Sequence, residues 1–140
     1  MTYEELLRHL GASLGLAALA AWPADECELT IDGMAVRLRH LREARQIEIE
    51  AQLPHASPLA WDAAAAMLAD NFIGASAPDA ICNIGPDGVA RLCMRQWLEP
   101  LSGEDFADSL ARFVARLERH LRLSATSPAA TAASPQWHAV

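Results

Sequence analysis

The chain has 140 residues, 52% of them hydrophobic, which is enough to build the core of one domain. Its formal net charge of −7 and the lack of any run of arginines leave no basic face for phosphate groups, so nucleic acid is not expected as a partner. The three cysteines are odd in number and widely spaced, which argues against a disulfide framework and favours a reducing, cytoplasmic setting.

The first expected element is a helix at the start of the sequence. Thr2 and Glu5 have the spacing of a capping box, and Gly15 is suited to end the helix in the left-handed backbone conformation. The apolar residues of one stripe are Tyr3, Leu6, Leu7, Leu10 and Leu14. Because the first residues lack the positive charge of a signal peptide and no apolar run is long enough for a membrane span, neither export nor membrane insertion is expected. Residues 16–22 either extend the helix or form a buried connector.

Residues 27–38 alternate between apolar and polar side chains, which is typical of a β-hairpin. The dipeptide Asp32-Gly33 between the two halves supplies the positive φ angles of a two-residue turn. Such a turn predicts a register that pairs Ile31 with Met34 and Leu29 with Val36.

A third alternating run covers residues 47–53. Its pairing with the preceding strand places Arg39 opposite Glu48 and Arg37 opposite Glu50, so that opposite charges meet on the solvent face. The three runs therefore predict an antiparallel meander.

An alanine-rich helix is predicted over residues 59–72, with Ser57 as its N-cap. One stripe of this helix is assigned to the protein's own core and consists of Trp61, Ala65, Leu68 and Phe72. A second stripe has small side chains that would let another backbone approach, and it consists of Ala60, Ala63, Ala64 and Met67. The second stripe is a candidate subunit contact, although Ala is also simply the best helix former.

A second hairpin is predicted over residues 80–98, with its turn at residues 85–88. Its return strand is apolar on both faces, with Ala90, Leu92 and Met94 on one and Val89, Cys93 and Trp97 on the other. One face belongs to the core, and the other is available for a partner. We therefore expect a homodimer through the central helix and this hairpin.

The last helix is predicted to begin at Ser102 and to end near residue 122. Its stripe consists of Phe106, Leu110, Phe113, Val114, Leu117 and Leu121. Residues 1–123 then form a single domain, and residues 124–140, rich in Ala, Ser and Pro, form a disordered tail in which only Trp137 could dock.

No catalytic motif is found. The histidines have no metal-ligand spacing and fall on five segments: His9, His40, His55, His120 and His138. His120 is explained by the dipole of its helix end, and Cys82 or Cys93 is more consistent with a buried, inert thiol than with a nucleophile. No catalytic residue, metal or cofactor is therefore expected. The alternative that stays open is a small α+β enzyme or ligand-binding domain with a pocket between sheet and helices.

The order helix, three strands, helix, two strands, helix resembles the class I chaperones of bacterial type III secretion, the family of the translocated intimin receptor chaperone. The resemblance covers residues 1–122 and is carried by YEELLRHLGASLGL, CELTIDGMAVRL, MLADNF followed by AICNIGPDGVARLCM, and LSGEDFADSLARFVARLERHL. It implies an α+β fold with an antiparallel sheet of about five strands and three helices.

The resemblance also implies a function. A homodimeric, non-enzymatic chaperone of this kind would bind the N-terminal region of one or a few secreted effectors in the cytoplasm and keep them soluble and competent for export. The dimer would use Ala60, Ala63, Ala64, Met67, Val89, Cys93 and Trp97. The effector would contact the first helix and adjoining strands through Leu6, Leu7, Leu10, Leu14, Leu29 and Ile31. The helix stripe of Leu6, Leu7, Leu10 and Leu14 is wide enough to leave some leucine surface uncovered once the helix rests on one edge of the sheet. A dimeric regulatory module that shares the fold without binding secreted cargo is a third possibility.

Overall fold

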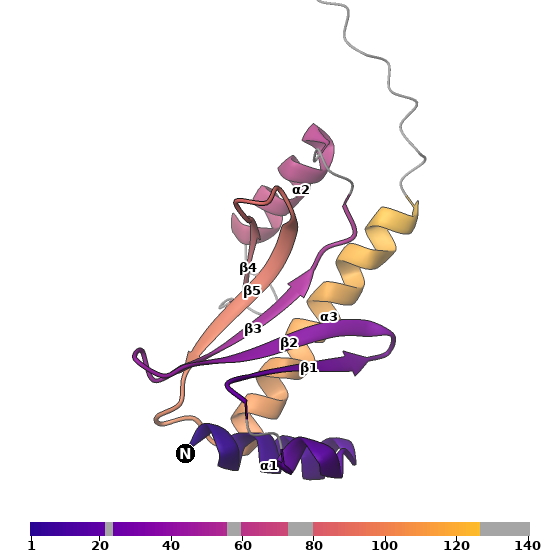
Figure 1. The fold of residues 1–140 in the computed structure, drawn as a ribbon. Coiled ribbons are helices and arrows are strands. Elements are labelled where there is room, and N and C mark those ends of the chain that lie inside the picture. Colours follow the sequence, from indigo (N-terminus) through magenta and orange to yellow (C-terminus); the bar gives the residue numbers. More distant parts are fainter. Residues whose placement is uncertain (22–23, 56–59, 73–79, 127–140) are drawn as a thin grey trace, which may run out of the picture.

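The computed structural model in Figure 1 describes residues 1–21, 24–55, 60–72 and 80–126. The helices are α1 (Tyr3–Leu14), the short 3₁₀ helix η1 (Ala17–Ala21), α2 (Trp61–Phe72) and α3 (Gly103–Thr126). The strands are β1 (Glu26–Ile31), β2 (Met34–Leu41), β3 (Gln46–Gln52), β4 (Ala80–Ile84) and β5 (Ala90–Trp97). This order confirms the predicted α+β fold. Of residues 16–22, whose structure the sequence left open, Ala17–Ala21 form this separate 3₁₀ helix with Leu19 in the core, and Trp22 lies outside the described residues.

The predicted start of α1 is confirmed. The amide of Glu5 donates to the hydroxyl of Thr2 at 3.2 Å, and the amide of Thr2 donates to the Glu5 carboxylate at 2.8 Å. Gly15 ends the helix with a φ of 69°, a conformation that a residue without Cβ adopts at little cost.

The five strands form one antiparallel sheet in the order β1-β2-β3-β5-β4, so that β1 and β4 are its edges. The first hairpin has the predicted register, with Ile31 opposite Met34 and Leu29 opposite Val36. Its turn residues, Asp32 and Gly33, have φ values of 50° and 81°. The pairs Arg37–Glu50 and Arg39–Glu48 are also opposite each other, as predicted.

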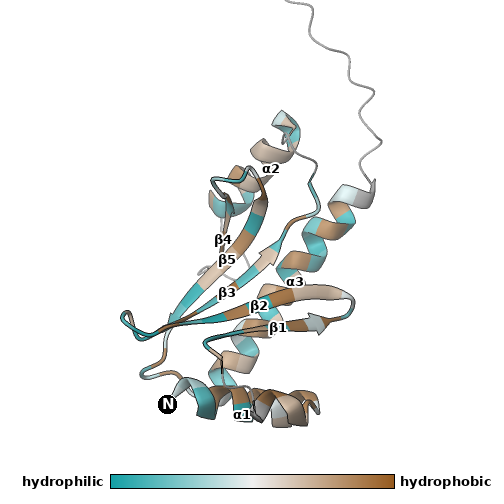
Figure 2. Cartoon of the chain, viewed as in Figure 1, coloured by the Kyte–Doolittle hydropathy of each residue, from teal (hydrophilic) through white to brown (hydrophobic). Residues whose placement is uncertain are grey.

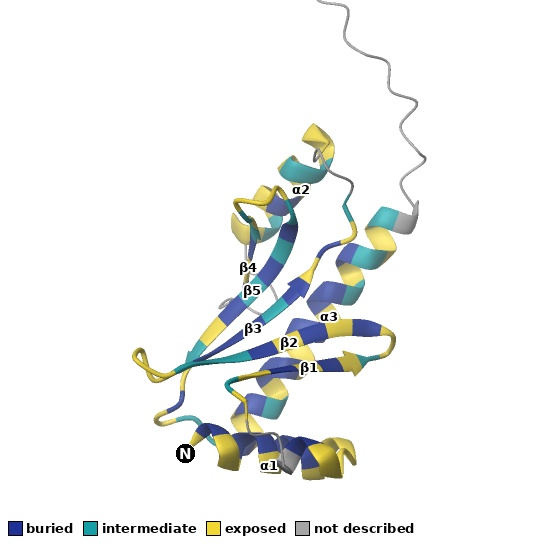
Figure 3. Cartoon of the chain, in the orientation of Figure 1, coloured by how far each residue is buried: buried dark blue, intermediate teal, exposed yellow. Residues whose placement is uncertain are grey.

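The core lies between one face of the sheet and the helices α1 and α3. Figure 1 shows α3 running behind the strands and α1 lying below β1, and Figure 3 shows buried residues recurring along β2, β3 and α3. The predicted stripe of α3 is confirmed, since its buried residues include Phe106, Leu110, Phe113, Val114 and Leu117. Each large apolar side chain buried here stabilises the fold by about 1.5–3 kcal/mol.

The predicted orientation of α2 is wrong. The side chains assigned to the core are exposed, with exposed fractions of 80% for Trp61, 66% for Leu68 and 85% for Phe72, whereas Met67 from the supposed subunit stripe is only 4% exposed. Ala63 and Ala64 are half-buried on the same side as Met67. Figures 2 and 3 show the result, because α2 combines hydrophobic colouring with exposed positions.

The physical reason is a polar residue on the inner face of α2. Asp70 lies three positions after Met67, and so on the same side of the helix. The Asp70 carboxylate accepts hydrogen bonds from α3. A helical wheel drawn from apolar residues alone places an aspartate on the solvent side. It therefore predicts the wrong rotation of α2 about its own axis. The predicted cap, Ser57, lies outside the described residues.

The predicted end of the last helix is also wrong. Helix α3 continues to Thr126, and the hydroxyl of Ser124 donates to the carbonyl of His120 at 3.0 Å inside the helix. The remaining part of the expected tail, with Trp137, lies outside the described residues. Within the ranges that the structure describes, no helix combines the length and apolar character needed to cross a membrane.

Candidate functional site

An apolar groove of about 310 Å³ lies between α1 and α3, beside the end of edge strand β1. Its lining comprises Leu10, Ser13, Leu14, Ile31, Ala107, Leu110, Ala111, Val114, Ala115 and Glu118. The alanines of α3 recur every four residues and so lie on one face of the helix. Their small side chains leave space there, and the larger leucine, isoleucine and valine side chains supply the apolar walls. We call this the α1–α3 groove.

The structure separates the six predicted effector-binding residues into two groups. Leu10, Leu14 and Ile31 line the α1–α3 groove. Leu6, Leu7 and Leu29 are buried in the protein's own core, so the wide stripe of α1 is almost completely covered. Surface access is confined to the end of the stripe, where Leu14 is 44% exposed against 1% for Leu10.

Sequence reasoning missed the α3 side of the groove. Leu110 and Val114 were assigned to the core stripe of α3, and both are indeed largely buried, but they also form part of the groove wall. The signal that was available is the alanine repeat at positions 107, 111 and 115, which marks a helix face without large side chains. Such a face either packs closely against a neighbour or stays open as a groove.

A second apolar surface lies on α2. It consists of Trp61, Ala65, Leu68 and Phe72, which we call the α2 stripe, and all four are exposed. On the neighbouring strand β4, Ile81 and Ile84 are also exposed. Of the predicted dimer residues, Ala60 and Trp97 are exposed, Val89, Cys93, Ala63 and Ala64 are half-buried, and Met67 is buried.

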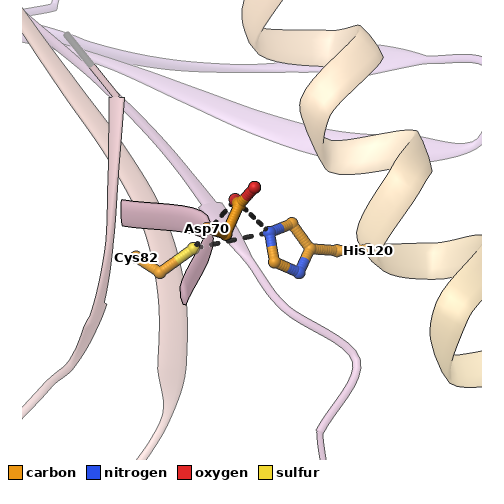
Figure 4. Close-up of side chains that lie close together, drawn as sticks. All are labelled: Asp70, Cys82 and His120. Carbon is orange, nitrogen blue, oxygen red and sulfur yellow. Dashed lines mark hydrogen bonds and ion pairs between the residues drawn. The ribbon is translucent and has the colours of Figure 1, made fainter. Parts of the chain in front are cut away.

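Three polar side chains from different elements meet under α2 (Figure 4). Nε2 of His120 on α3 lies 2.9 Å from Oδ2 of Asp70 on α2 and 3.4 Å from Sγ of Cys82 on β4. The Cys82 sulfur is 3.8 Å from the same carboxylate oxygen. Sequence spacing could not predict that these three side chains lie together, because their contact depends on the rotation of α2 about its own axis.

The geometry does not support a nucleophilic cysteine. In a Cys-His-Asp triad the carboxylate and the thiol contact different nitrogens of the imidazole, whereas here Asp70 and Cys82 both face Nε2 of His120. Burial raises the pKa of the Cys82 thiol, so the thiol stays protonated at neutral pH. Burial and the nearby Arg116 and Arg119 lower the pKa of His120, so its imidazole is neutral there.

The same three side chains could in principle hold a metal ion, but two arginines supply the positive charge instead. Nε of the buried Arg116 donates to Oδ2 of Asp70 at 2.6 Å, and Arg119 binds the other carboxylate oxygen, Oδ1. Arg116 also donates to the carbonyl of Ala80. Because these guanidinium groups already neutralise the carboxylate and would repel a further cation, the arrangement favours a structural ion-pair cluster.

The role predicted for His120 needs correction. It was assigned to the dipole at the end of α3, yet its side chain contacts Asp70, as does that of Arg116 on the same helix. The available signal was their spacing, since Arg116, Arg119 and His120 lie at positions i, i+3 and i+4 and so share one face of α3. Where cationic side chains reach the buried face of a helix, a buried acidic partner is expected.

The structure thus defines a class of small α+β protein with an apolar groove at a free sheet edge and a second apolar surface on a separate helix. The chain belongs to the Tir chaperone protein (CesT) family, whose family model matches residues 5–121. This confirms the resemblance to class I type III secretion chaperones. Among curated proteins, no sequence matches the chain.

Solved structures of similar fold include three complexes. One chain of the ExsC-ExsE complex matches with a TM-score of 0.72 and 21% identity, covering 88% of this chain and 96% of that one. The Yersinia pestis type III secretion chaperone SycH, in complex with a stable fragment of YscM2, matches with a TM-score of 0.60 and 18% identity, covering 84% and 98%. One chain of the ExoU-SpcU complex from the type III secretion system of Pseudomonas aeruginosa matches with a TM-score of 0.62 and 19% identity, covering 87% of this chain and 94% of that one.

Proposed function

We propose that the protein is a cytoplasmic chaperone that binds the N-terminal region of one or a few type III secreted effectors and keeps them soluble and competent for export. Membership of the Tir chaperone protein family supports this function. The structural observation that carries it is the α1–α3 groove, an open apolar site directly beside an edge strand.

The groove and the edge strand together suit an extended peptide. Strand β1 pairs with β2 on one side only, so the backbone groups of its other side can bind an added strand. Apolar side chains of that peptide would then enter the groove next to Leu14 and Ile31. Each large apolar side chain buried there would contribute about 1.5–3 kcal/mol before the cost of ordering the peptide.

The α2 stripe supports the proposal of a homodimer. Monomeric proteins rarely expose a continuous apolar surface of this kind, and Trp61, Leu68 and Phe72 are the side chains that such a contact would bury. The contact would involve the opposite face of α2 from the one predicted, because Met67 is buried. Ala60, Val89 and the β5 residues Cys93 and Trp97 remain proposed contacts at its border. A contact of standard size would bury about 1,600 Å² in total.

The rival function, an enzyme or ligand-binding domain, depends on Cys82, Cys93 or a histidine. Burial raises the pKa of both thiols, and the imidazole of His120 faces Asp70 and Cys82 through a single nitrogen. These groups are therefore poorly arranged for nucleophilic chemistry, and the apolar groove is the better candidate site.

The test is a capture experiment with matched variants. Tagged wild-type protein should retain one abundant partner from native cytosol, held through the first part of the partner's chain as mapped by limited proteolysis and mass spectrometry. The Leu14→Asp variant places a charge in the groove at an exposed position and should lose that partner. Leu123→Asp, at another exposed leucine that is outside the groove lining, is the control and should retain it. Retention by Leu14→Asp would refute the groove as the binding site.

A further inference from the structure

Helix α2 has little apolar anchoring to the rest of the molecule. Of its 12 residues only Met67 is buried. The large apolar side chains of the α2 stripe face away from the core. Hydrophobic burial on its own therefore stabilises the docked position of α2 only weakly, by about the contribution of a single methionine side chain.

Polar contacts hold the C-terminal end of α2 instead. The Asp70 carboxylate accepts from Arg116 at 2.6 Å and lies 2.9 Å from Nε2 of His120, and Arg119 also donates to it. The next residue, Asn71, pairs with the backbone of Cys82 through two hydrogen bonds. Its Nδ2 donates to the Cys82 carbonyl at 2.9 Å, and the Cys82 amide donates to its Oδ1 at 2.7 Å. We call these six residues the Asp70 cluster.

The cluster also reaches the helix backbone. Arg116 donates to the carbonyl of Asp70 at 3.3 Å and to the side chain of Asn71 at 3.2 Å. A carbonyl in the last turn of a helix lacks a partner inside the helix, so a guanidinium donor there stabilises the helix end. One fully buried arginine of α3 thus joins α3 to both the side chains and the backbone of α2.

The cluster determines the direction of the α2 stripe. Met67 and Asp70 share the inner side of α2, and Leu68 and Phe72 share the outer side. Because side chains project from fixed angles around a helix, holding Asp70 against α3 fixes the rotation of α2 and keeps the stripe outward.

We propose that the Asp70 cluster is the positioning element that fixes α2 in the orientation in which the α2 stripe can contact a second copy of the chain. Asp70 is the central positioning residue, since it receives contacts from three side chains of α3. The role in positioning α2 stands on the contacts within one chain, and only its effect on self-association rests on the proposed homodimer.

Replacement of Asp70 by Asn tests this directly. The change keeps the size of the side chain and removes the charge, which leaves the buried Arg116 without its carboxylate partner. The expected result is local detachment of α2, seen by hydrogen–deuterium exchange as a roughly hundredfold faster exchange of the α2 amides. The amides of β2 and β3 should keep their wild-type protection, because the two strands pair with each other and β5 separates them from β4, the strand that carries Cys82.

The matched control is Asp62→Asn, the same substitution in the first turn of the same helix, at an exposed position. It should leave the exchange of α2 unchanged. If Asp70→Asn does not fold, Arg119→Gln is measured in its place. This variant removes only the half-exposed donor to Asp70, and it should also speed the exchange of the α2 amides. Wild-type exchange of α2 in the folded variant would overturn the proposal.

Sedimentation of the same variants separates this proposal from the proposed function. Asp70→Asn should self-associate more weakly than wild type although every side chain of the α2 stripe is unchanged. Capture of the effector by the groove is a different measurement, so its failure would refute the chaperone function while the exchange result still decides the role of the Asp70 cluster. Undiminished self-association of Asp70→Asn would overturn the claim that the cluster presents the stripe.

Discussion

Nε of Arg95 lies 2.6 Å from Oε2 of Glu48, although the two residues are far apart in sequence and both belong to the sheet face opposite the helices. Arg39 binds the other carboxylate oxygen from the neighbouring strand. Glu48 is only 4% exposed, because the two arginine side chains cover it. The carboxylate of Glu48 on β3 thus forms ion pairs with arginines of both neighbouring strands, β2 and β5, on the outer face of the sheet.

We predict that Glu48→Gln lowers stability near neutral pH by about 1–2 kcal/mol. Burial alone would raise the pKa of Glu48, but hydrogen bonds from Arg95 and Arg39 outweigh it and hold the pKa below the ordinary value of 4.5. The stabilisation is therefore complete above pH 4.5 and is lost as the pH falls through the lowered pKa of the folded state. Chemical denaturation at several pH values checks this, and an equal loss at every acidic pH would contradict it.

Two neighbouring leucines of the α1 stripe, Leu10 and Leu14, should respond differently to truncation. Leu10→Ala removes a core side chain and should cost about 2–5 kcal/mol of stability. Leu14→Ala removes a partly exposed side chain and should cost less than about 1 kcal/mol. Urea unfolding of both variants decides the matter, and similar losses would show that Leu14 belongs to the core.

A charge on the α2 stripe should prevent self-association. Phe72→Asp lies at an exposed position, so the fold should be retained while association weakens by roughly thirtyfold or more, as expected for a central aromatic contact. Sedimentation equilibrium measures the change, with Leu123→Asp as an equally charged surface control. A wild-type protein that stays monomeric at micromolar concentrations would show that the stripe is not a self-contact.

Acidification should destabilise the fold through His120. Burial, Arg116 and Arg119 lower its pKa below the ordinary 6.5, so the folded state favours the neutral imidazole. Stability is then greatest above pH 6.5 and falls as the pH decreases toward the lowered pKa. Thermal unfolding between about pH 5 and 8 should show this slope.

The matched variant is His120→Gln, which keeps a donor for Asp70 and removes the titrating group. Its slope should be shallower than that of wild type. Asp70 and Cys82 face the imidazole from α2 and β4, and burial raises the pKa of the Cys82 thiol above this range. His55 is close enough to interact with His120, and burial lowers its pKa too, so part of the slope should remain. An unchanged slope would assign the effect to other groups.

The strands were predictable because their signals are local. The alternation of residues 27–38 and the Asp32-Gly33 turn demand the same register, and the opposite charges at Arg37 and Glu50 agree with it. A local conflict at any of these positions would have been visible in the sequence.

The rotation of α2 was not predictable from apolar periodicity. Asp70 lies on the inner face because it meets three α3 side chains, and that meeting requires residues about fifty positions apart to be placed first. The Asp70 cluster and the α3 wall of the groove were not predicted for the same reason, since both depend on contacts between residues far apart in the sequence. Alanine gave no guide either, since it suits a helix face that is buried, open or in contact with a partner.

The free edge of β1 also bears on aggregation. Glu26 and Glu28 are exposed along this strand, and Asp32 follows it in the turn. Two copies meeting edge to edge would bring these carboxylates together, and like charges directly opposite each other destabilise a strand pair. The acidic edge therefore discourages the chain from polymerising through its own sheet, and the same charges favour an incoming strand that is basic or neutral.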